Sequence, residues 1–222
     1  KDPGVFIVFD VLKATEEEWM TAANLWHTRK ILDQGEHWYD TQYDSLTNTV
    51  HETNSNLLIY FPKTHYRLEM VEDEHRNYQN EIAISQYTGQ HFELGQHIGF
   101  VTALVPHASD VDPRPWLDKI KFIDSDNPGD GMSVEIVLDD RTIQVGMKQD
   151  MRMAMVRDFR RPKYTYEAGQ INYGKVETNA DFFYTEKTKK KLNFTVVNVS
   201  KAFYDGKELF SQLPSQFGLA FD

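Results

Sequence analysis

Apolar and β-branched residues recur in short runs along most of the chain, and polar or glycine-containing segments separate these runs. Within several runs, such as residues 194–199, apolar and polar positions alternate, which is typical of a β-strand with one buried face. The predicted strands are residues 5–11, 56–61, 65–71, 81–87, 97–105, 120–123, 133–138, 142–147, 152–157, 170–176, 181–184, 192–199 and 203–210.

Turn signals between the runs predict tight hairpins. Asp139-Asp140 separates two predicted strands, and Asp205-Gly206 carries the Asp-Gly pair that favours a two-residue hairpin turn. Many short strands joined by such turns are typical of an all-β fold. We therefore expect a large antiparallel β-sandwich that occupies residues 1–222 as a single region.

One segment carries two conflicting patterns. Thr15 and Glu18 resemble a helix capping box, and apolar residues from Trp19 to Trp26 follow at helical spacing, which predicts a helix from about residue 16. The same residues also alternate as in a strand. We favour the strand, because it would continue a meander from residues 5–11 and because packing readily overrides intrinsic propensity.

Composition narrows the functional classes. The 222 residues include 24 Lys and Arg and 34 Asp and Glu, so the net charge is −10. A generic nucleic-acid binder has a basic domain, so this class is excluded. No apolar run approaches the length of a membrane span. Cysteine is absent, which excludes disulfides, thiolate nucleophiles and thiolate zinc sites together.

The loop at residues 124–135 partly matches a calcium-binding loop. Oxygen donors occupy positions 1, 3, 7 and 12 and glycine occupies position 6, but Pro128 replaces the donor expected at position 5. The flanking segments are predicted strands rather than helices. An acidic hairpin loop with glycine accounts for the pattern without a metal, and we favour it over calcium. The candidate metal ligands are Asp124, Asp126, Asp130 and Glu135.

Two groups of side chains are candidates for binding a sugar. Trp26 and His27 place an aromatic ring beside an imidazole, which suits stacking on a sugar face. Arg157 and Arg160 belong to a basic cluster that could hold a carboxylate or sulfate by bidentate hydrogen bonds. A hydrogen-bonded or surface histidine and a solvated strand face explain the same residues without a ligand. No catalytic triad, nucleophile elbow or phosphate loop is readable.

Five segments carry a wider pattern: residues 4–12 (GVFIVFDVL), 24–28 (NLWHT), 100–107 (FVTALVPH), 178–183 (TNADFF) and 204–210 (YDGKELF). In this order they resemble the C-terminal β-sandwich region of heparinase II/III-like polysaccharide lyases. The resemblance spans nearly the whole chain, and its motifs are strand patterns.

The resemblance implies β-elimination on a polysaccharide that contains uronic acid, of the glycosaminoglycan or alginate type. In this reaction a Tyr or His base removes the proton next to the carboxyl group, while neighbouring groups neutralise the carboxylate. In that family most of this machinery lies on an N-terminal α/α toroid and on a His-x-His segment, and neither is present in this sequence. No residue here matches a catalytic or zinc-binding position.

We therefore expect a fragment of a longer chain that is inactive by itself and begins at Lys1 by truncation. The implied partners are an acidic polysaccharide and the missing toroid, which would also carry any divalent metal. The implied location is the periplasm or the cell exterior. One alternative is a stand-alone carbohydrate-binding sandwich that uses Trp26, Trp38 or Trp116 for stacking. Another is a structural sandwich that braces a neighbouring domain.

Overall fold

The computed structural model describes residues 4–42, 55–72, 82–127, 129–154, 163–166 and 168–221. The all-β prediction is confirmed, since antiparallel strand pairs dominate this part of the chain. Its helical segment, α1 (Pro115–Lys119), was not predicted. Within the described ranges, no helix has the length and apolar character needed to cross a membrane. The chain divides into unit 1 (Lys1–Gln96 and Phe100–Asp118) and unit 2 (His97–Gly99 and Lys119–Asp222).

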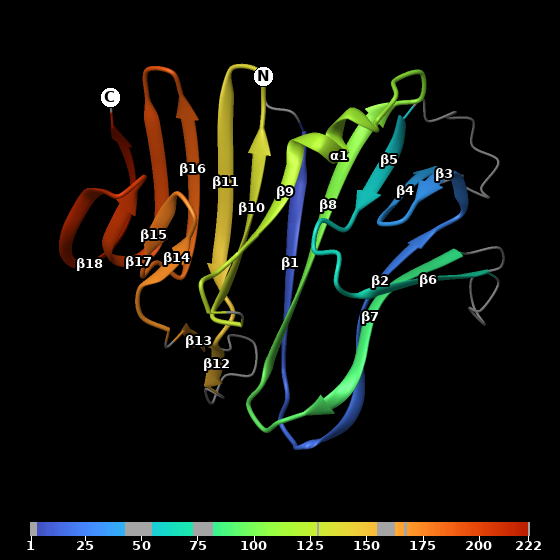
Figure 1. Cartoon of the computed structure of the whole chain (residues 1–222), viewed down its shortest axis with the longest axis horizontal. Helices are drawn as coiled ribbons and strands as arrows, with labels where there is room; N and C mark the ends of the chain where they lie inside the picture. Colours follow the sequence, from blue (N-terminus) through green and yellow to red (C-terminus); the bar gives the residue numbers. More distant parts are fainter. Residues whose placement is uncertain are drawn as a thin grey trace. The chain divides into compact units, whose positions relative to one another are not determined.

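Unit 1 is a sandwich of two sheets. Its strands are β1 (Phe6–Lys13), β2 (Glu18–Thr28), β3 (Lys30–Gly35), β4 (Trp38–Gln42), β5 (Ser55–Tyr60), β6 (Arg67–Glu72), β7 (Ile82–Phe92) and β8 (His97–Ala108), of which the first three residues of β8 belong to unit 2. Among the described residues, one sheet has the strand order β1-β8-β5-β4-β3 and the other has the order β2-β7-β6 (Figure 1).

The core of unit 1 lies between these two sheets. Tyr39 and Ile59 come from the larger sheet and Ile84 from the smaller one, and Phe61 follows β5; all four are buried. The rings of Tyr39 and Phe61 meet edge to face with centroids 6.5 Å apart. Trp26, Leu68 and Met70 cover this cluster from the smaller sheet. One face of each sheet is therefore apolar and buried, as the alternating pattern predicts.

Strand β2 settles the conflict between helix and strand in favour of the strand. It pairs with β7 over its whole length, from Glu18 opposite Phe92 to Thr28 opposite Ile82. From Trp19 to Thr28, even-numbered positions of β2 are buried or half-buried and odd-numbered positions are exposed. Burial of one face and pairing along the strand outweigh the local capping signal.

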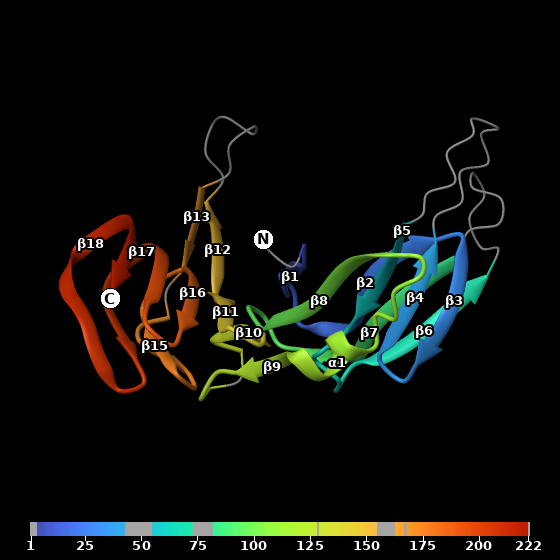
Figure 2. The same ribbon diagram turned by 90° about the horizontal axis from the view of Figure 1, so that it is seen from above.

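Unit 2 is built around a sheet of its own. Its strands are β9 (Ile120–Asp124), β10 (Gly131–Val137), β11 (Arg141–Lys148), β12 (Met151–Ala154), β13 (Lys163–Tyr166), β14 (Ile171–Tyr173), β15 (Val176–Thr178), β16 (Phe182–Thr188), β17 (Leu192–Tyr204) and β18 (Lys207–Phe221). The described strands of this sheet follow the order β14-β15-β17-β16-β11-β10-β9, β18 pairs with β17, and β12 and β13 form a separate ribbon. Figure 2 shows this sheet curving at β15, β17 and β18.

Both predicted hairpin turns are confirmed. The Leu138 N–H donates to the Arg141 carbonyl at 2.8 Å, which closes the β10–β11 turn. Asp205 and Gly206 have φ angles of 51° and 74°, as a type I′ turn between β17 and β18 requires. The single strand predicted over residues 170–176 is wrong, because Gly174 turns the chain at a φ of 81° and separates β14 from β15. Strands β3 and β4 were not predicted.

Candidate functional site

The outward side of the β2-β7-β6 sheet in unit 1, here called the outer face, exposes aromatic and basic side chains together. Directly opposed residues of antiparallel strands share a face. The strand registers therefore place these residues on one surface. The outer face consists of Trp19, Thr21, Ala23, Leu25 and His27 from β2, Ala83, Ser85, Tyr87, Gly89 and His91 from β7, and Arg67, Glu69 and Val71 from β6.

Trp19 dominates one end of the outer face. Its side chain is 76% exposed, and its ring meets His91 edge to face at a centroid distance of 6.1 Å. Its neighbours along β2 on this face, Thr21 and Ala23, are small and leave the indole open. An exposed indole offers a large apolar surface together with an N–H donor, the combination that stacks on the C–H face of a sugar ring.

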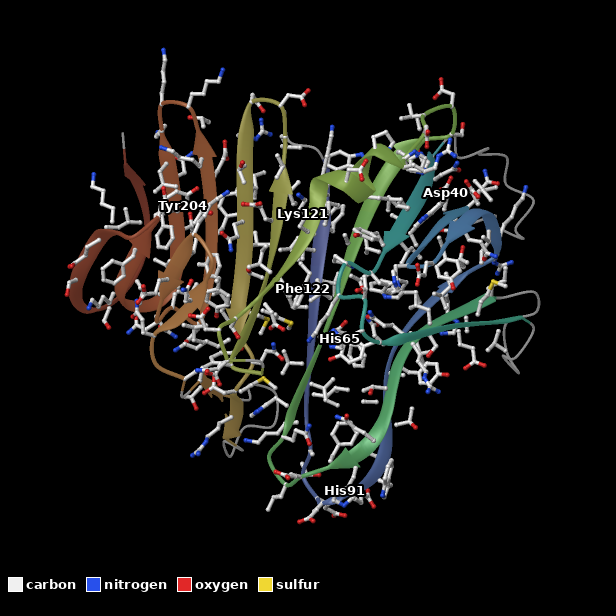
Figure 3. All side chains as sticks on the ribbon, viewed as in Figure 1. Asp40, His65, His91, Lys121, Phe122 and Tyr204 are labelled. Carbon is white, nitrogen blue, oxygen red and sulfur yellow. The ribbon has the colours of Figure 1, made fainter. Side chains whose placement is uncertain are left out.

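Polar groups also occur along this face. Arg67, His27 and His91 supply nitrogen donors, and Glu69 supplies a carboxylate. His91 Nε2 also lies 4.0 Å from Glu17 Oε1. Figure 3 shows His91 at the end of the long β2–β7 ribbon. A surface on which aromatic rings alternate with hydrogen-bond donors and acceptors suits a polyhydroxylated ligand better than it suits a purely apolar ligand.

The predicted sugar-binding pair is split between the two sides of the sheet. His27 is exposed on the outer face, whereas Trp26 is half-buried and packs against the core. Its Nε1 atom donates to Thr102 Oγ1 at 3.2 Å, and Asn24 Nδ2 donates to the same oxygen at 3.0 Å. The alternative stacking residues Trp38 and Trp116 are also half-buried. Arg157 and Arg160 lie outside the described residues.

The candidate metal ligands do not converge in the described part of the loop. Asp124 Oδ1 accepts from the Ser125 N–H at 3.0 Å, and Asp130 Oδ2 accepts from Asn127 Nδ2 at 3.1 Å. Glu135 Oε2 lies 2.9 Å from Lys175 Nζ, and this hydrogen bond raises the pKa of Lys175. Among the described residues, no group of three or more His, Asp or Glu side chains is placed to hold a metal ion.

The structure does bring two of the candidate metal ligands, Asp126 and Asp130, to a small polar hollow of unit 2. This hollow has a volume of about 280 Å³ and lies between the loop and the β14–β15 hairpin. Three carboxylates in its lining would repel an anionic sugar. Its polar lining residues are Asp126, Asp130, Glu177, Asn127, Gln170 and Asn172.

His107 and Asp40 form a buried pair in unit 1 that the sequence did not reveal. His107 Nε2 lies 2.9 Å from Asp40 Oδ1, and its Nδ1 atom lies 2.9 Å from the Ala108 carbonyl oxygen. Both ring nitrogens therefore already have an acceptor within hydrogen-bonding distance. This geometry suits a hydrogen bond that stabilises the fold. A general base would need a ring nitrogen directed at the substrate.

Comparison with known protein families finds no matching family model, and comparison with curated proteins finds no matching sequence. The resemblance to heparinase II/III-like lyases therefore stays a prediction, and the outer face with Trp19 at one end is the feature on which a function can be argued.

Proposed function

We propose that this chain is the β-sandwich part of a heparinase II/III-like polysaccharide lyase, and that it binds an acidic polysaccharide on the outer face without cleaving it. The observation that carries the binding proposal is the 76% exposure of Trp19 beside His91. A ligand that stacks on the indole would account for this exposure. The strand motifs quoted above support the parentage.

The direct test is binding of the chain to alginate, heparan sulfate and chondroitin sulfate. We expect Trp19→Ala to weaken binding of the preferred polysaccharide at least tenfold, because the sugar ring can no longer stack on the indole. The variant should keep the folded structure. Phe6→Ala is the matched control, since Phe6 is an aromatic residue on β1 that is 61% exposed and lies off the outer face. Equal effects of the two substitutions would contradict the proposal.

The same samples test the claim that the chain does not cleave its ligand. β-Elimination produces an unsaturated sugar that absorbs ultraviolet light, and we expect no increase in absorbance with the isolated chain. Turnover would show that the catalytic groups lie within this sequence. In the proposed setting, the toroid of the parent lyase carries the base and any divalent metal, and the protein acts in the periplasm or outside the cell.

A stand-alone carbohydrate-binding sandwich is the second candidate, and the outer face supports it equally. The two candidates differ in the parent gene, which encodes a helical toroid in one case only. A purely structural sandwich predicts that none of the polysaccharides binds.

A further inference from the structure

Tyr87 gives the outer face a second aromatic residue. It lies on β7, the central strand of the sheet, opposite Ala23 of β2. Tyr87 is half-buried, and the two residues that flank it across the strands, Ala23 and Arg67, are exposed. A tyrosine ring combines an apolar face with a polar hydroxyl, so it can stack on a sugar as an indole does. The outer face therefore has two places at which a sugar ring can stack.

The surface between the two aromatic residues is made of small residues. Thr21 of β2 pairs with Gly89 of β7. This pair, here called the saddle, lies between Trp19 and Tyr87 on the outer face, and both of its members are exposed. Gly89 has no side chain, so a ligand that rests on both aromatic rings can approach the backbone of β7 between them.

The backbone at Gly89 would accept another residue. Its φ angle lies outside the left-handed region, and the register of β2 and β7 passes through it without the shift that a bulge causes. A Cβ atom at this position would lie 3.5 Å from Thr21 Oγ1, which is ordinary van der Waals contact. Glycine inside a strand lowers stability, and the close approach of a ligand is one reason for its presence there. The saddle therefore suits a ligand that passes close to the backbone.

The spacing of the two aromatic residues sets the length of the ligand. Tyr87 is four positions from His91, the partner of Trp19, which corresponds to about 13 Å along a strand. A single pyranose ring is shorter than this distance. We infer that the outer face binds a linear stretch of several sugar residues along β2 and β7, with Trp19 and Tyr87 stacking on different sugars above the saddle. The inference rests on the proposed function, which it deepens by naming the length and direction of the ligand.

Binding of two oligosaccharides of different length tests the inference. A disaccharide and a tetrasaccharide are prepared from whichever of alginate, heparan sulfate and chondroitin sulfate binds most tightly. We expect the wild-type chain to bind the tetrasaccharide at least tenfold more tightly in calorimetry, because only the longer ligand reaches both aromatic rings.

Tyr87→Ala should weaken binding of the tetrasaccharide about tenfold and change that of the disaccharide less than about twofold. The reason is that a ligand too short to reach both rings will stack on Trp19, which is the more exposed of the two. Trp19→Ala should weaken binding of both ligands. A general loss of structure in Tyr87→Ala would also weaken both, so the two lengths separate stacking from folding.

Gly89→Val tests the saddle by adding a side chain. The branched side chain would fill the space between the aromatic rings and should weaken binding of the tetrasaccharide at least tenfold. The unfolding temperature should stay equal or rise, because valine is favoured over glycine in strands. Ala83→Val is the matched control, since Ala83 lies on the same strand and face, six positions from Gly89 and beyond Tyr87. It should leave binding of the tetrasaccharide unchanged.

Equal affinity of the wild-type chain for the disaccharide and the tetrasaccharide overturns the inference and leaves the proposed function intact. A folded Gly89→Val variant with wild-type affinity for the tetrasaccharide also overturns it, as does a folded Tyr87→Ala variant that weakens both ligands equally. If Tyr87→Ala does not fold, Gly89→Val decides. Failure of the wild-type chain to bind any of the three polysaccharides overturns the proposed function and the inference together.

Discussion

The Nε2 atom of His107 lies 2.9 Å from the Oδ1 atom of Asp40, although 67 residues separate the two in the sequence. Their strands, β8 and β4, are not neighbours, because β5 runs between them in the sheet. The side chains are only 4% and 10% exposed, and Figure 3 marks Asp40 beside β4 and β5. The contact therefore links β4 to β8 across β5 through one pair of side chains.

Asp40→Ala should lower the free energy of unfolding by about 2 kcal/mol, because it leaves a buried ring nitrogen of His107 without its hydrogen-bond partner. Denaturant unfolding followed by fluorescence measures the change. Asp112→Ala is the control, since Asp112 forms an exposed pair with Arg114 at 2.9 Å and should matter little. Equal stability of the two variants would refute a structural role for the buried pair.

Tyr173→Phe should leave the stability of the protein unchanged or raise it by up to about 1 kcal/mol. The Tyr173 side chain is almost fully buried, and its hydroxyl has no hydrogen-bond partner among the described residues. Phenylalanine keeps the ring contact with Phe183, whose centroid is 4.9 Å away. A loss of more than 1 kcal/mol in thermal or denaturant unfolding would mean that the hydroxyl has a bound partner.

The same tyrosine should make stability depend on pH in the alkaline range. Burial raises the pKa of Tyr173 above its ordinary value of 10.0, and the charges of Asp150 and Asp130 raise it further. Above pH 10 the unfolded chain loses this proton more readily than the folded one, so folding becomes less favourable as the pH rises. Below pH 10 Tyr173 is protonated in both the folded and the unfolded chain, so its ionisation does not reduce the stability there.

The difference in unfolding free energy between Tyr173→Phe and the wild-type protein should therefore grow from pH 9 to pH 11 in favour of the variant. Tyr204→Phe is the comparison within unit 2. Burial also raises the pKa of Tyr204, but this residue is only half-buried, so its substitution should change the pH dependence less. A difference that stays constant with pH would rule out the effect.

Gly131→Ala should destabilise unit 2 by about 2 kcal/mol, as overpacking of a filled core does. A Cβ atom at this position would overlap the Tyr173 ring, including its hydroxyl oxygen. Tyr173→Phe should recover part of the loss, which a double-mutant cycle would measure as a coupling energy. Gly169→Ala is the control, since a Cβ atom there meets nothing within 4 Å.

Local features of the fold were predictable from the sequence because their causes are local. The Asp139-Asp140 and Asp205-Gly206 turns depend on the backbone preferences of two or three adjacent residues. Strand β3 (Lys30–Gly35) escaped prediction because it is an edge strand and four of its six residues are exposed, so it carries little apolar pattern.

The site was less predictable because it depends on which face of a strand is covered. The alternation in β2 separates Trp19 and Leu25 from Trp26, but it does not say which set points to the core. Thr102, on β8 and 76 residues further along the chain, accepts the Trp26 hydrogen bond and identifies the inner side.

Strand β8 has a consequence for any attempt to dissect the molecule genetically. Its first three residues, His97–Gly99, belong to unit 2, and the rest of the strand belongs to unit 1. No single cut in the gene can therefore separate the two units intact. Expression of residues 1–96 would omit the strand that pairs with β5, and recombination between relatives at one crossover point would always mix parts of both units.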